Sequence, residues 1–102
     1  MSRDQLKIEK LIWDTWNKEH IKKHGVSVGE VNSGIKHGRK VIKNTYNNRL
    51  LVLVELKTRL LSVVLNKDKA KDKRFYVVTA RDMSKEERVI FKNEYPQNAT
   101  KI

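Results

Sequence analysis

Cysteine is absent from this chain, and proline occurs only once, at position 96. The lack of cysteine excludes disulfide bonds and cysteine-ligated zinc, and it leaves the redox compartment open. No window approaches the roughly 18 apolar residues of a membrane span, and the N-terminus lacks the apolar run of a secretory signal. We therefore expect a cytoplasmic protein that makes no use of a membrane.

Acidic residues are scarce beside basic ones. The 102 residues include 12 Asp and Glu against 23 Lys and Arg, which gives a formal charge of +11. The isoelectric point near 10.0 exceeds the value of about 9 above which nucleic-acid binding is suspected. A basic soluble surface or an acidic protein partner would produce the same excess. The 38% of apolar residues suffices for one domain over 1–102, with a core at about 6–95 and a tail at 96–102.

Three helices are expected, at residues 14–24, 27–34 and 84–95. Each begins with a side chain that can cap a helix, and the second and third carry capping boxes that end in glutamate: Asp14, Ser27 with Glu30, and Ser84 with Glu87. Gly25 is a suitable exit from the first helix, and Pro96 favours an end to the last. Residues 6–13 are ambiguous between a short strand and the start of a helix.

Between the second and third helices the apolar period changes to two, which is typical of strands. We expect four, at residues 37–45, 49–56, 59–66 and 74–80. Asn47-Asn48 and Lys57-Thr58 are short enough for tight turns, and residues 67–73 are charged and turn-like. The sequence therefore predicts an α+β domain in the order α-α-β-β-β-β-α, with an antiparallel four-stranded meander and helices packed on one face.

Two histidines four residues apart, His20 and His24, fall on one face of the first expected helix, interleaved with Trp13 and Trp16. Imidazoles are well suited to proton transfer near neutral pH. A histidine among tryptophans can equally pack in a core or hydrogen-bond a backbone carbonyl. A zinc site is the third alternative, but cysteine and an HExxH motif are both absent. The tryptophans can stack bases or pack in the core.

Arginines lie at three ends of the expected strands: Arg49, Arg59 and Arg81. A folded meander can bring two of them to one rim, where guanidinium groups bind phosphate in a bidentate way. Surface solvation and ion pairs with Glu55 or Glu87 are the alternatives. Further cationic or aromatic candidates for RNA contact are Lys23, Arg88 and Tyr95, although Tyr95 can simply pack at its helix end and Lys23 can belong to a solvated face.

Motifs at both ends of the chain resemble the BrnT family. The N-terminal pattern is WDxxNxxHxxKHGVS, carried by Trp13, Asp14, Asn17, His20 and residues 23–27. The middle is matched by Arg49 and Arg59-Leu60-Leu61, and the C-terminal pattern is Val77-Val78-Thr79-Ala80-Arg81 with Glu87-Arg88 and Tyr95. The resemblance implies a RelE-like fold and a ribonuclease toxin of a type II toxin–antitoxin system, neutralised by an antitoxin protein. It also implies that Arg49 and Arg81 line the site.

Metal-independent RNA cleavage needs groups that exchange protons and fixed cations beside the phosphate. We therefore expect catalysis by His24, His20, Arg49 and Arg81, and RNA binding by Lys23, Arg59, Arg88 and Tyr95, with no cofactor and no metal. The expected partners are RNA and a cognate antitoxin, in a homodimer or a toxin–antitoxin hetero-oligomer. The alternative is a catalytically inactive RNA-binding or antitoxin-binding domain of the same fold.

Overall fold

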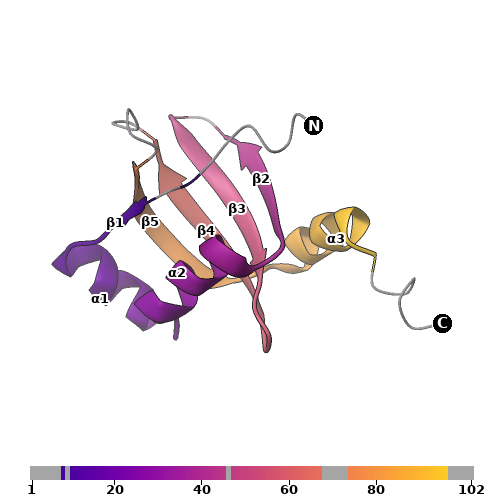
Figure 1. Ribbon diagram of the computed structural model, residues 1–102, viewed down its shortest axis with the longest axis horizontal. Helices are drawn as coiled ribbons and strands as arrows, with labels where there is room; N and C mark the ends of the chain where they lie inside the picture. Colours follow the sequence, from indigo (N-terminus) through magenta and orange to yellow (C-terminus); the bar gives the residue numbers. More distant parts are fainter. Residues whose placement is uncertain (1–7, 9, 46, 68–73, 97–102) are drawn as a thin grey trace.

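Five strands form one mixed sheet in the computed structural model, which describes residues 8, 10–45, 47–67 and 74–96 (Figure 1). The strand order across the sheet is β1-β5-β4-β3-β2. Along the chain the elements are β1 (Lys10–Ile12), α1 (Thr15–Lys23), α2 (Val28–His37), β2 (Lys40–Asn44), β3 (Arg49–Glu55), β4 (Leu60–Asn66), β5 (Arg74–Asp82) and α3 (Lys85–Glu94). The predicted α+β class is confirmed.

The four strands expected from the sequence pair as antiparallel neighbours, from β2 to β5. The expectation of a wholly antiparallel, four-stranded sheet is wrong, because the ambiguous segment before α1 forms β1. This strand pairs parallel with β5, with Lys10 opposite Arg74 and Ile12 opposite Tyr76. Three residues are too few to show a period, and the partner strand lies far along the chain, so no local pattern identifies this pairing.

The helices cover both faces of the sheet, and the expectation of a single covered face is wrong. Leu50, Val52 and Val54 of β3 belong to the core that includes Ile21 of α1 and residues of α2. Leu53 points to the opposite face and packs with Met83 and Phe91. Figure 1 shows α3 apart from α1 and α2. The continuous apolar run in β3 is the sequence feature that fits a strand buried on both faces.

Helix α2 continues to His37, three residues beyond the predicted end, and β2 begins only at Lys40. Gly34 lies inside the helix, at a position where a Cβ would lie 2.9 Å from the Leu56 side chain. Gly38 ends the helix against the neighbouring strand, where a Cβ would lie 2.3 Å from the carbonyl oxygen of Glu55. Gly34 and Gly38 therefore let α2 approach β3 closely.

Both predicted turns are present. Asn47 and Asn48 have φ angles of 63° and 57°, in the left-handed region that asparagine tolerates. Lys57 and Thr58 connect β3 to β4, and the Leu56 amide donates to the Arg59 carbonyl at 2.9 Å. Gly25, with a φ of 75°, makes the predicted exit from α1. Most of the charged segment 67–73 and the tail 97–102 lie outside the described residues.

Candidate functional site

The first residues of the WDxxN pattern have structural roles. Asp14 caps α1 by accepting a hydrogen bond from the Asn17 amide at 2.9 Å, and it also accepts one from the Tyr76 hydroxyl at 3.1 Å. Asn17 is 0% exposed. Its Nδ2 donates to the carbonyl oxygens of Ile12 and Val77, both at 3.0 Å, and its Oδ1 accepts from the Asp14 amide at 2.8 Å. These bonds tie β1 and α1 to β5 and fix the helix that carries both histidines.

Three aromatic rings form a continuous column along the outer side of α1. Trp16 stacks on His20 with ring centroids 4.7 Å apart and an interplanar angle of 10°. His24 meets His20 edge-on, with centroids 5.2 Å apart. His20 is half-buried and His24 is exposed. Among the described residues, no hydrogen-bond partner engages either imidazole. The alternative of histidines sealed in the core does not apply.

A hollow of about 450 Å³ lies along this column and is lined by Thr15, Trp16, Glu19, His20 and Lys23. Lys23 is an exposed cation next to His24 in the sequence. Glu19 is exposed too, and within the described part of the chain its carboxylate has no hydrogen bond or ion pair. Glu19 was not among the residues predicted from the sequence.

Arg59 is the arginine that the structure brings to the histidine end of α1. Its Nη1 donates to the carbonyl oxygen of Gly25, one residue after His24, at 2.9 Å. Its guanidinium also binds Asp82 at 2.8 Å and contacts Glu30 at 3.4 Å. The hydrogen bond to Asp82, with the nearby carboxylate charges, raises the pKa of Arg59 although desolvation opposes the shift. Arg59 therefore fixes the junction between α1 and α2, and most of its donors are occupied.

Arg81 lies on the opposite face of the sheet from α1. It pairs across the strands with Ser62, whose side chain shares the face of Leu53 rather than that of the larger core. Arg81 binds Glu87 through two hydrogen bonds of 3.0 and 3.1 Å. Burial alone would raise the pKa of Glu87, but hydrogen bonds from Arg81, the Ser84 amide and Ser62 outweigh it and lower the pKa. The ion pair named as an alternative for Arg81 is therefore formed.

The remaining predicted contacts are also away from the histidines. Arg49 begins β3, a seven-residue strand of about 20 Å, at the end farther from the turn beside Arg59. Arg88 and Tyr95 belong to the α3 side of the sheet, where Arg88 donates to the Met83 carbonyl at 3.4 Å. The Tyr95 hydroxyl donates to the Lys40 carbonyl at 2.9 Å, and its ring packs on Phe91, as in the packing alternative.

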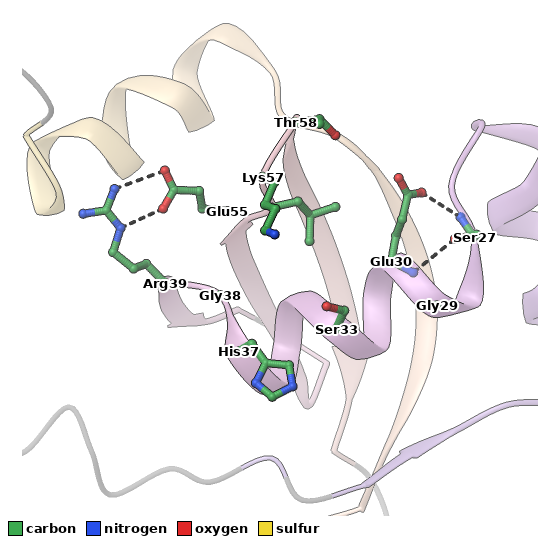
Figure 2. Close-up of a pocket in the computed structure, with 11 residues that line it drawn as sticks. Ser27, Gly29, Glu30, Ser33, His37, Gly38, Arg39, Glu55, Lys57 and Thr58 are labelled. Atoms are coloured by element: carbon green, nitrogen blue, oxygen red, sulfur yellow. Dashed lines mark hydrogen bonds and ion pairs between the residues drawn. The ribbon is translucent and has the colours of Figure 1, made fainter.

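A second hollow, of about 710 Å³, separates α2 from the turn between β3 and β4 (Figure 2). Both of its carboxylates are occupied: Glu30 accepts from the Ser27 amide at 3.0 Å, and Glu55 binds Arg39 at 2.7 Å. In Figure 2 the side chains of Lys57 and Ser33 project from opposite sides of the space. With its carboxylates engaged, this hollow is less suited to proton transfer than the histidine column.

Among the described side chains, no group of three or more histidines or carboxylates is arranged to hold a metal ion. No helix in the described part of the chain is long and apolar enough to cross a membrane. Comparison with family models, curated proteins and solved structures finds no match to this chain.

Proposed function

We propose that this chain is a BrnT-like toxin that cleaves RNA without a metal, with the outer side of α1 as its reaction site. The observation that supports the proposal is the pair of solvent-accessible imidazoles, with ring centroids 5.2 Å apart and no partner for their nitrogens among the described residues. This pair belongs to a chain of charge +11, and Lys22 and Lys23 lie between the two histidines in the sequence. A polyanion is attracted to such a surface, and imidazoles can move its protons.

The proposed reaction uses the 2′-hydroxyl of the substrate as nucleophile. One imidazole takes the 2′-hydroxyl proton while the oxygen attacks the adjacent phosphorus, and the other gives a proton to the departing 5′-oxygen. The products are a 2′,3′-cyclic phosphate and a free 5′-hydroxyl, so no water or cofactor is consumed in this step. Lys23 lies beside the pair and is the cation closest in the sequence to His24 that can neutralise the phosphorane.

A catalytically inactive RNA-binding or antitoxin-binding domain is the second candidate. The separation of the arginines favours it, because Arg81 is engaged by Glu87 on the other face and Arg49 lies at the far end of β3. Both candidates use the same positive charge, and cleavage of RNA distinguishes them.

Cleavage of a mixed-sequence RNA in EDTA tests the proposal. We expect products with 2′,3′-cyclic phosphate ends, and a loss of rate of about 10²-fold or more in His24→Gln or His20→Gln. His37→Gln is the matched control, because His37 lies at the end of α2 beside the other hollow, and its rate should equal that of the wild type. Salt-sensitive RNA binding without cleavage would leave the inactive module, and unchanged cleavage by both variants would refute the histidine mechanism.

The proposal includes a cytoplasmic location and a cognate antitoxin, with assembly as a homodimer or as a toxin–antitoxin hetero-oligomer. The excess of positive charge fits an acidic partner segment as well as RNA. A small protein encoded beside this gene should suppress both cleavage and the toxicity of expression, and toxicity that persists in its presence would contradict this part of the proposal.

A further inference from the structure

We infer that the hollow beside Trp16 is a guanine subsite, in which an unpaired base stacks on Trp16 and the Glu19 carboxylate binds its Watson–Crick edge. The inference rests on the proposed ribonuclease function and adds base specificity to it. Both side chains line the same hollow of about 450 Å³, together with His20, and ligand sites commonly have a volume of this order. The base would therefore be held next to an imidazole of the reaction site.

Trp16 is suited to stacking because it is 58% exposed and yet held in place. Its ring lies nearly parallel to that of His20, at 10°, so a base that covers the exposed indole extends an existing stack. Stacking on an aromatic side chain requires an unpaired base and accepts any of the four. Stacking on Trp16 would therefore select single-stranded RNA. Recognition of one particular base requires a second group.

Glu19 supplies that second group. An ionised carboxylate only accepts hydrogen bonds, and its two oxygens match two neighbouring donors. Among the four bases, only guanine presents two adjacent donors on its Watson–Crick edge, at N1 and N2. A carboxylate that faced the phosphate backbone would repel it, so contact with a base is the more favourable use of Glu19 beside Lys23.

Cleavage of short single-stranded RNAs that differ at one nucleotide beside the cut tests the subsite. We expect guanosine to be preferred over inosine, which lacks the N2 amino group, by about tenfold or more in kcat/KM. Glu19→Gln should reduce this ratio towards one while cleavage persists. Glu86→Gln is the matched control, because Glu86 is an exposed glutamate of α3 with no partner among the described residues. An equal loss on all substrates would overturn the inference and make Glu19 a proton-transfer residue, and an unchanged ratio would overturn it as well.

A binding assay separates failure of the subsite from failure of the ribonuclease. Guanosine 3′-monophosphate should quench the tryptophan fluorescence of the wild type. Its Kd from this quenching should be about tenfold lower than that of inosine 3′-monophosphate. The quenching should be lost in Trp16→Phe, which retains the emission of Trp13. Guanine-selective quenching without RNA cleavage would preserve the subsite and refute the ribonuclease. Equal affinity for both nucleotides would refute the subsite even if the protein cuts RNA.

Discussion

Replacement of Asn17 by alanine should strongly destabilise the protein without any direct effect on a ligand. The side chain makes three hydrogen bonds, of 2.8, 3.0 and 3.0 Å, that connect the cap of α1, the end of β1 and β5. Asn17 is 0% exposed and its bond to the Val77 carbonyl is buried, so water is poorly placed to replace that donor. Alanine would leave the Ile12 and Val77 carbonyls without these donors and would open a small cavity.

The magnitude follows from the number of bonds. A typical hydrogen bond contributes about 0.5–1.5 kcal/mol to stability, so three give a loss of about 1.5–4.5 kcal/mol, and the unsatisfied carbonyls favour the upper half of that range. Since a domain of this kind has a free energy of unfolding of about 5–15 kcal/mol, the loss is a large share. Asn17→Asp should cost more, because a buried carboxylate oxygen would face two carbonyl oxygens.

Urea denaturation followed by circular dichroism measures this loss as a lower midpoint with an unchanged slope. Asn93→Ala is the control, since Asn93 is an exposed asparagine of α3 and should change the free energy of unfolding by less than about 0.5 kcal/mol. If Asn17→Ala were no more harmful than Asn93→Ala, the structural role of the WDxxN asparagine would be refuted.

Three further predictions concern packing and pH. Gly38→Ala should destabilise the protein by about 1–3 kcal/mol, because its Cβ would meet the Glu55 carbonyl at 2.3 Å. Gly29→Ala, with only a contact at 3.9 Å, should instead stabilise α2 by about 0.5–1 kcal/mol in thermal unfolding. Folding lowers the pKa of Glu87, so its carboxylate stabilises the folded state above its unfolded pKa and loses this effect as pH falls through the folded pKa. The stability difference between wild type and Glu87→Gln should therefore shrink on acidification below about pH 5, and a difference that stays constant from pH 7 to pH 3 would contradict the Arg81–Glu87 account.

Local patterns predicted most of the elements of this fold. The boundaries of α1 and α3 follow from Asp14 and Ser84 as caps, because a cap satisfies amides within the next turn of the same helix. The turn at Asn47-Asn48 follows from the tolerance of asparagine for a left-handed backbone. Strand β1 did not follow, because its hydrogen bonds depend on β5 and on Asn17 rather than on neighbouring residues.

The candidate site was predicted only in part. The spacing of His20 and His24 places them on one helix face whatever the rest of the chain does, so their contact was foreseeable. The arginines depended on strand ends that the meander was expected to bring together. Alternation along a strand decides which face a side chain occupies, and Arg81 faces away from α1. Glu19 was missed because a single glutamate among charged residues carries no signal until its neighbours are known.

By itself the sequence determined charge, capping and turns, together with the histidine pair on one helix, because these depend on composition or on residues within about four positions of one another. Only the tertiary structure decided which sheet face each helix covers, the parallel pairing of β1, and the partners of the arginines, because these join segments that are distant along the chain. Hydrogen bonds and ion pairs across such distances form only where packing brings the groups together, and no local pattern encodes that packing.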